Sequence, residues 1–552
     1  MKPVLLAHAI ALLFAATAST QAATPGIKDA LSNERIGLLD AGKLQITDGN
    51  CSNCASSPQS LWYFQDQAIA VPGAGVPIAG FTPRMDRRAD ITAWAATPAA
   101  LELAYPSVTW IGAREIADSA RLSADGVSLA PEGGAPMPFQ LAPKLSTNRS
   151  YANATTMAYF SARPLRLRGD VKERDGKPTF VARTIWPADY AIDGSRLTVH
   201  PVAGSGDLDQ FVRDDAFKRD DHLSTRLVWE KSPGAGAQLA NKPVLGLVLN
   251  GAQGDDDESL GGHFAVATGR FGAHGEWADW AVNNFYNLDA VSEKGILAGT
   301  LPMDNYLMDL NSGQQYYRPS YMLVAVLKDA RTAVAYQGAV QRSFNHFYRH
   351  DMLYEHAANN CSGISIDVFR ALGWHVPERG PTSRTKAVGA WFYVGAKEGS
   401  LKKGRNIYDY LTAETTRLYP SVAFDALGVD LLQLVGALPT RARTLSPFEQ
   451  QLKDDVEAIV LVKIPQLPSS RVTGSRPAAS FDDYMARVPA DQAKWQVVPV
   501  GPRPFPAALR DAQTAQLSGT PVVPLPVAAI GMAGLFGGGA WWRRRRKQAR
   551  RP

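Results

Sequence analysis

Short apolar runs alternate with turn residues along the chain from residue 24 to about residue 243. Runs of β-branched and aromatic residues between Gly, Pro, Asn or Asp positions are typical of strands. Such runs read "SLWYFQDQAIAVPG", "SVTWIGAREI", "RPLRLRGDV", "PTFVARTIWPADYAI" and "SRLTVHPVAG". "RPLRLRGDV" and "SRLTVHPV" alternate apolar with polar positions, which predicts strands with one face in solvent. We therefore expect a mainly β N-terminal domain over 24–243.

The pattern changes over 244–400, where strands are followed by helices. "PVLGLVLNG", "GGHFAVATGRFG", "GEWADWAVNNFYNLD" and "SYMLVAVLKD" predict strands, and the stretch 330–360 has helical composition. Another helix is predicted from Cys361 to Leu372, because apolar residues recur there at every fourth position and Gly373 provides a stop signal. The pattern indicates an α+β unit.

Beyond residue 400 the pattern is mixed. "NIYDYLTAETTRLYPSVAFDALGVDLLQLVGAL" predicts helices and "EAIVLVKIP" predicts a strand, so 401–500 reads as a helical or mixed α/β C-terminal extension. The Pro-rich stretch 501–526 is typical of a linker.

The N-terminus has the pattern of a secretory signal. Lys2 precedes an apolar run, and the small residues Thr20 and Ala22 occupy the positions that a signal peptidase reads. We expect cleavage after Ala22 or Ala23, so that 1–23 is a signal peptide and the rest of the chain is exported.

The C-terminus, "VVPLPVAAIGMAGLFGGGAWWRRRRKQARRP", joins an apolar Gly-rich segment to a basic cluster. The segment 527–542 is shorter than the roughly 20 residues of a membrane span, whereas 522–542 reaches that length. Arginines stay in the cytoplasm, so 543–552 predicts a basic cytoplasmic tail with the body on the periplasmic or cell-surface side.

The C-terminal pattern of "VPLP", a Gly-rich apolar stretch and "RRRRK" resembles the PEP-CTERM class of bacterial sorting signals, in its VPLPA-type variant. That resemblance implies recognition by an exosortase-type enzyme and removal of the tail; a plain single-pass anchor has the same topology.

The charge distribution argues against nucleic acid as a partner. The chain has a net charge of +6, of which 543–552 contributes seven positive charges and Lys2 one more. Removal of these eight charges leaves the body between the two termini at −2. The basic isoelectric point therefore reflects orientation at a membrane, and nucleic-acid binding is excluded.

The chain has three cysteines. Cys51 and Cys54 form a Cys-x-x-Cys pair, which in an exported protein most simply makes a disulfide; a redox pair and a metal site are the alternatives. If these two pair, Cys361 is left over, either as a buried apolar residue or as a reactive thiol.

Cys361 stands in the first turn of its predicted helix, after Asn359 and Asn360, either of which can cap the helix. The unpaired N–H groups and the positive end of the helix dipole stabilise a thiolate there. The same N–H groups can hold an oxyanion that forms when a carbonyl is attacked. The position predicts a nucleophile.

A thiol nucleophile needs an imidazole base and a third polar group that orients the base. His263 opens a predicted strand straight after two glycines, where another element can approach closely. If the hairpin that follows is centred between residues 273 and 274, Asn284 lies opposite His263 on the same face. A shift of one residue brings Asn283 opposite instead, and Asp279 competes for the role. His263 read alone is equally typical of a core histidine.

These elements resemble the permuted papain-like branch of the NlpC-type peptidase superfamily, in which the cysteine helix follows the histidine strand. The branch includes bacterial amidase-like and acyltransferase-like members, and "GGHFAVATG" and "NNCSGISIDVFRALG" carry the resemblance over about 244–372. It implies that Cys361 is the nucleophile, His263 the base and Asn284 the orienting residue.

Other clusters give weaker indications. His346 and His350 have the i, i+4 spacing of a zinc pair, but the glutamate of His-Glu-x-x-His is missing and surface histidines are the simpler interpretation. "GDDDESLGG" lacks the ligand spacing of a calcium loop and reads as a solvated acidic loop. The sequence has no Gly-x-Ser-x-Gly elbow and no phosphate-binding glycine loop.

The predicted fold class is α+β, with a mainly β N-terminal domain, a permuted papain-like domain, a mixed C-terminal region and a single C-terminal membrane segment. The predicted function is an exported, membrane-tethered cysteine hydrolase that cleaves an amide or ester of cell-wall peptide or an envelope acyl group without a cofactor. The alternatives are a non-catalytic surface or matrix protein that uses the same scaffold for binding, and a transacylase with the same triad. The predicted segments are 1–23, 24–243, 244–400, 401–500, 501–526, 527–542 and 543–552.

Overall fold

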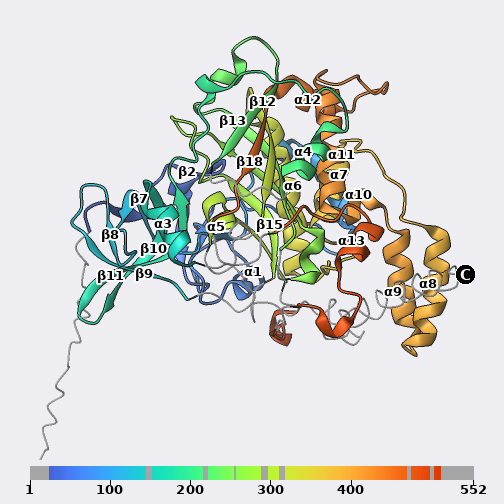
Figure 1. Ribbon diagram of the computed structural model, residues 1–552, viewed down its shortest axis with the longest axis horizontal. Coiled ribbons are helices and arrows are strands. Elements are labelled where there is room, and N and C mark those ends of the chain that lie inside the picture. The colour runs from blue at the N-terminus through green and yellow to red at the C-terminus, as the bar shows by residue number, and fades with distance from the viewer. Residues whose placement is uncertain are drawn as a thin grey trace, which may run out of the picture.

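The computed structural model describes most of the chain between residues 24 and 510 (Figure 1). Within that part the chain forms a ten-stranded sheet, a six-stranded sheet and a small two-stranded sheet. The described residues are 24–143, 152–215, 222–253, 256–287, 296–309, 318–468, 474–497, 501 and 503–510.

The ten-stranded sheet forms the centre of the molecule and combines strands from distant parts of the sequence. All neighbouring pairs are antiparallel except β16 and β6, which pair in parallel. In spatial order the strands are β12 (Ser224–Glu230), β18 (Val456–Ile464), β17 (Ser320–Leu327), β13 (Pro243–Asn250), β14 (His263–Arg270), β15 (Ala281–Asn287), β16 (Ile296–Pro302), β6 (Thr109–Trp110), β5 (Ile69–Pro72) and β4 (Leu44–Thr47).

The six-stranded sheet lies to one side, at the left of Figure 1. Its strands in spatial order are β1 (Ile27–Asp29), β7 (Glu115–Leu122), β10 (Leu165–Arg174), β11 (Lys177–Pro187), β9 (Met137–Leu141) and β8 (Ser128–Ala130). The two-stranded sheet consists of β2 (Arg35–Ile36) and β3 (Leu39–Asp40).

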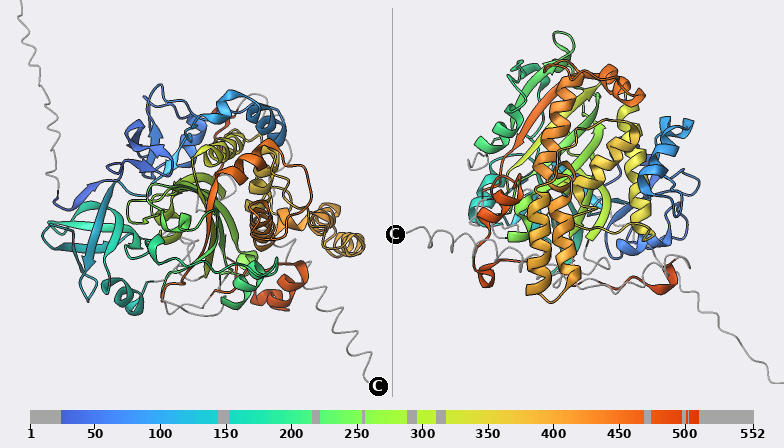
Figure 2. Two further views of the ribbon diagram at one scale, coloured as in Figure 1. Left: turned by 90° about the horizontal axis from the view of Figure 1, so that it is seen from above. Right: turned by 90° about the vertical axis from the view of Figure 1, so that its right-hand side faces the viewer.

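Three long helices cover the middle of the ten-stranded sheet: α6 (Arg331–Tyr348), α7 (Cys361–Leu372) and α11 (Pro420–Leu434), which contact β13 or β14 or both (Figure 2). Two strands of this sheet, β13 and β17, are buried along their whole length. Continuous apolar runs are typical of strands that are covered on both faces. The remaining helices are α1 (Pro58–Tyr63), α2 (Arg87–Ala95), α3 (Ala154–Ser161), α4 (Asp207–Asp215), α5 (Met303–Met308), α8 (Arg384–Lys397), α9 (Leu401–Thr412), α10 (Thr415–Leu418), α12 (Pro447–Asp455) and α13 (Phe481–Arg487).

The predicted fold class is wrong, because the regions expected to fold one after another share one architecture. Strands from 24–243 extend the same sheet as those of 244–400, and β18 of the C-terminal region lies inside that sheet. One continuous apolar core includes residues from Ile27 to Phe505. The molecule therefore has mixed α/β content. Strands from one predicted region pair with the edge strands of another, so those edges are not left exposed.

The predicted C-terminal membrane segment belongs to a part of the chain that the structure does not describe. Among the helices in the described ranges, none has both the length and the apolar character needed to cross a bilayer. The predicted signal peptide 1–23, most of the linker 501–526, the segment 527–542 and the tail 543–552 lie outside the described residues.

Several predicted elements are confirmed and others are wrong. The helix expected from Cys361 to Leu372 has those bounds, and Gly373 ends it with a φ of +105°. "SLWY" lies in a helix, α1, because Ser57 accepts the N–H of Ser60 and Pro58 occupies the first turn. "SRLTVHPV" forms no strand: Val199 makes one isolated bridge, with Leu227.

Candidate active site

Helix α7 begins at Cys361 because Asn360 caps it. The Asn360 side-chain oxygen accepts the backbone N–H of Gly363 at 2.7 Å, and its Nδ2 donates to the carbonyls of His356 and Leu418. Asn359, the other candidate cap, instead accepts a hydrogen bond from Arg87. The thiol is therefore held at the positive end of a twelve-residue helix, and Cys361 is only 7% exposed.

His263 is the first residue of β14, and its imidazole lies beside the Cys361 thiol. Nε2 of the ring contacts the side-chain oxygen of Asn284, on the neighbouring strand β15. Since Nε2 faces Asn284, Nδ1 is the ring nitrogen available to the sulfur. The structure thus brings together the three residues that the sequence selected, whose catalytic role stays a prediction.

The register of the β14–β15 hairpin differs from the predicted one by two residues. Val266 pairs with Asn283, so Asn284 lies across from residue 265 and diagonally from His263. Because side chains alternate between faces, a shift of two residues keeps His263 and Asn284 on the same face. A shift of one would have separated them, so the parity of the register decides the contact.

The two competitors for the orienting role lie elsewhere. Asn283 faces helix α6, where its side chain bonds to Gln337, Gln341 and Thr300 in a buried network. Asp279 binds Arg166 at the junction of the two large sheets. Among the three candidates, Asn284 is the one whose oxygen meets the imidazole.

The pKa of the Cys361 thiol is lowered to about 7 from its usual value near 9. Burial acts in the opposite direction and is the largest single effect, because it disfavours the charged thiolate. The charge and hydrogen bond of His263 outweigh it, together with the backbone N–H of Phe264 and the hydroxyl of Ser362. The sulfur is therefore largely a thiolate just above neutral pH.

Sequence reasoning missed two tyrosines at this site. The Tyr354 hydroxyl is within hydrogen-bonding reach of the Cys361 thiol and backbone N–H, and burial raises the pKa of Tyr354 well above its usual value. Tyr306 in α5 is fully buried, its ring centroid lies 6.5 Å from that of His263, and its hydroxyl donates to Asn250. Neither tyrosine belongs to a sequence motif, so only the tertiary structure could identify them.

An open cleft of about 530 Å³ lies next to the triad but does not include it. Its walls include Asn359, Asp367 and Arg417, together with Glu355 and Met352 from the segment that also carries Tyr354. Asp367 is bound there by Arg87 and Arg417, at 2.7 and 2.8 Å. The segment 352–359, which leads into α7, therefore lines the cleft and, through Tyr354, also contacts the thiol.

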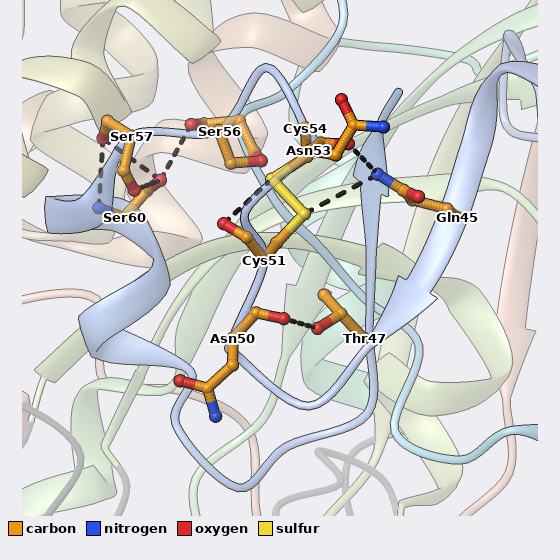
Figure 3. Close-up of a disulfide and its surroundings, with 10 residues drawn as sticks. Gln45, Thr47, Asn50, Cys51, Asn53, Cys54, Ser56, Ser57 and Ser60 are labelled. Carbon is orange, nitrogen blue, oxygen red and sulfur yellow. Dashed lines mark hydrogen bonds between the residues drawn. A yellow bond between two sulfur atoms is a disulfide. The ribbon is translucent and has the colours of Figure 1, made fainter. Parts of the chain in front are cut away.

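Cys51 and Cys54 are joined in a disulfide in the loop before α1 (Figure 3). The side-chain amide of Gln45 donates to the Asn53 carbonyl at 2.7 Å and lies 3.6 Å from the Cys51 sulfur. The free cysteine is Cys361. A thiol reagent therefore has one target in this protein.

The weaker sequence indications do not form a metal site in the described part of the chain. Helix α6 ends at Tyr348, and His350 has a φ of +63°, so His346 and His350 do not share a helix face. His346 is buried against Asp90 at 3.0 Å, and His350 contacts the Tyr63 hydroxyl. No group of three His, Cys, Asp or Glu side chains suited to a metal ion occurs among the described residues.

No protein-family model, curated protein or solved structure matches this chain. The resemblance to the NlpC-type superfamily therefore stays a prediction that depends on the two quoted motifs. The possible chemistry of the site is therefore argued from the contacts of Cys361, His263 and Asn284 alone.

Proposed function

We propose that this protein is a cysteine hydrolase that works by acyl transfer on an amide or ester. The observation that carries the proposal is the position of the His263 imidazole between the Asn284 oxygen and a thiol whose pKa is lowered to about 7. A nucleophile, a base and an orienting group in contact are the features of a catalytic triad. A structural cysteine among aliphatic side chains would have a raised pKa instead.

The proposed reaction runs in two halves. The Cys361 thiolate attacks the substrate carbonyl carbon, and the protonated His263 gives its proton to the leaving amine or alcohol as the carbonyl–heteroatom bond breaks. Water then attacks the thioester, His263 accepts a proton from that water, and the acid leaves as the thiolate reforms. Asn284 accepts the Nε2 hydrogen and so keeps Nδ1 toward the sulfur.

The N–H groups at the start of α7 that Asn360 does not cap are the donors available to the oxyanion. The Cys361 N–H is one of them, and the Tyr354 hydroxyl lies against it. A carbonyl oxygen that approaches this N–H therefore also meets Tyr354. We include Tyr354 in the proposed site for that reason.

The compartment is part of the proposal. The signal-like pattern of 1–23 and the sorting-like pattern at the C-terminus support export and an envelope substrate, either cell-wall peptide or an acyl group. A transacylase would use the same first half-reaction and differ only in the nucleophile that resolves the thioester.

The test is acyl-enzyme formation. Full-length protein is mixed with p-nitrophenyl acetate, release of p-nitrophenolate is followed, and mass spectrometry of peptides from the quenched protein locates the acetyl group. We expect an initial burst and an acetylated Cys361 in the wild type, no burst in Cys361→Ala, and a burst rate about 10²- to 10⁴-fold lower in His263→Ala. The matched control is His200→Ala, because His200 is exposed and its ring bonds Thr198. A burst that survives in Cys361→Ala, or a wild type without acetylation at Cys361, would refute the proposal.

A further inference from the structure

Helices α8 and α9 form a hairpin that projects from the body, at the right of Figure 1. The sequence "KEGSL" makes the connection: Gly399 has a φ of +58°, and Ser400 caps α9 by accepting the N–H of Lys403. The helices pack against each other through Ala387 and Val394 of α8 and an apolar stripe on α9. The side of α8 that carries Ala387 and Val394 is therefore covered by α9.

The opposite side of α8 is also apolar, but it is exposed. Val388, Phe392 and Tyr393 are 47%, 65% and 44% exposed, and Leu401 at the start of α9 is 77% exposed. In the described part of the chain nine large apolar side chains are prominently exposed, and these four are among them. A helix that is apolar on two faces needs a second apolar surface.

Three of the four exposed side chains lie along one side of the hairpin, and Tyr393, the residue after Phe392, flanks them. Val388 and Phe392 are one turn apart, and Gly395 lies on the same side of the helix one turn further on. A Cβ atom at Gly395 would lie 3.9 Å from Cδ2 of Leu401, so Leu401 extends this stripe to the tip of the hairpin. The Trp391 ring lies beside that of Phe392, with centroids 4.9 Å apart and the two planes tilted by 43°. We name Val388, Phe392, Tyr393 and Leu401 the hairpin stripe.

The charge of the hairpin identifies the chemistry of its partner. Residues 384–412 contain six basic and two acidic side chains, a net charge of +4. The body between the two termini carries −2, so outside the hairpin it carries −6. Lys402 is exposed next to Leu401, and the Lys397 ammonium lies 5.9 Å from the Tyr393 ring centroid. Aromatic and aliphatic side chains bordered by Lys and Arg are typical of helices that lie in an anionic membrane interface.

We propose that the α8–α9 hairpin docks on an anionic lipid surface through the hairpin stripe. The apolar side chains enter the boundary between headgroups and acyl chains, and the net positive hairpin, with Lys402 exposed beside Leu401, faces the lipid phosphates. The body, which is net negative, stays away from the same surface. The hairpin thereby sets the orientation of the protein on the membrane, independently of the hydrolase activity.

The test measures contact between the hairpin and acyl chains in the full-length protein. A fluorophore is attached at Ala396→Cys, an exposed position on α8, in a Cys361→Ser background so that one thiol reacts. The matched control position is Val127→Cys, which is exposed and directly precedes β8, on the opposite side of the molecule from α8 in Figure 1. Both proteins are mixed with vesicles of phosphatidylcholine, with or without phosphatidylglycerol, whose acyl chains are brominated to quench the fluorophore. The apolar C-terminal stretch is present in every variant and contributes equally.

We expect strong quenching at position 396 with anionic vesicles, little quenching with phosphatidylcholine alone, and little at position 127 with either. Phe392→Ser/Leu401→Ser should remove most of the quenching, whereas Leu101→Ser, another exposed apolar position, should leave it unchanged. Absence of quenching at position 396, or equal quenching at both positions or with both lipids, would overturn the proposal. So would energy transfer between differently labelled copies without lipid, because the stripe would then bind a second copy.

Discussion

At the scale of single residues, the pKa of the Cys361 thiol depends on three effects: burial, the His263 imidazole and nearby N–H groups. Burial of Cys361 raises the pKa of its thiol, and the neighbouring imidazole and N–H groups lower it further than burial raises it. The groups that lower the pKa come largely from one place, because His263 and Phe264 are adjacent at the start of β14. The reactivity of Cys361 therefore reports directly on the position of the imidazole.

The pH dependence of alkylation tests this balance. The rate of Cys361 modification by iodoacetamide should rise with pH through a midpoint of about 7, because only the thiolate reacts and its pKa is lowered. Below that midpoint the sulfur is protonated and reactivity is lost. In His263→Ala the midpoint should move up to the usual thiol value near 9 or above, because burial then raises the pKa without the opposing imidazole, and in His200→Ala it should stay at the wild-type value. A wild-type midpoint at the ordinary value would show that the imidazole does not act on the sulfur.

At the scale of elements, the strand and the helix of the site are held at their ends. Gly262 precedes β14 with a φ of +73°, and a Cβ there would collide with the Asn250 carbonyl, so glycine lets the chain enter the strand beside β13. Asn360 joins the start of α7 to Leu418 as well as capping it. These two ends put His263 and Cys361 next to each other.

Removal of the α7 cap should lower stability and thiol reactivity together. Asn360→Ala leaves the Gly363 N–H without its acceptor and should cost about 1 kcal/mol or somewhat more in the free energy of unfolding. Asn360→Ser is the matched control, because serine restores the cap but not the bonds to His356 and Leu418. Urea unfolding and the alkylation midpoint measure the two effects. If Asn360→Ala equals the wild type in both, the cap does not position the sulfur.

At the scale of the whole molecule, buried ion pairs connect the two large sheets. Arg168 of β10, in the six-stranded sheet, binds Asp304 of α5 at 2.8 Å, and both side chains are fully buried. Arg166 binds the same carboxylate at 3.2 Å. Arg183 of β11 binds Asp309 at 3.2 Å, just after α5. Because α5 directly follows β16, these contacts hold one sheet against the other.

Asp304→Asn should therefore weaken the junction of the sheets strongly. Loss of the carboxylate removes one partner from each of two buried guanidinium groups, which keep Asp279, so we expect a cost of about 3 kcal/mol, at the low end for a broken buried ion pair. Asp189→Asn is the matched control: its ion pair with Arg163 is half exposed, and we expect a loss below about 1 kcal/mol. Chemical denaturation of both variants measures the difference. Equal losses would show that the buried pairs do not stabilise the junction.

The sequence by itself determined the local elements and the chemistry of the site. Apolar periodicity and Gly373 determined the bounds of α7, and two glycines before His263 indicated a strand start open to another element. Helix ends and residue types are local properties, because caps, stop signals and thiol chemistry act within a few residues. Cys361 and His263 could be named on that basis, whereas Asn284 was selected from a hairpin register that the structure shifts by two residues.

Only the tertiary structure decided which residues meet. The register of β14 against β15, the contact of Tyr354 with Cys361 and the addition of β4, β5 and β6 to the central sheet depend on pairings between distant parts of the chain. Each pairing is one of several that the same pattern of side chains allows, since strands two residues out of register bury the same face. Packing of the whole core selects among them, and the local sequence does not contain that choice.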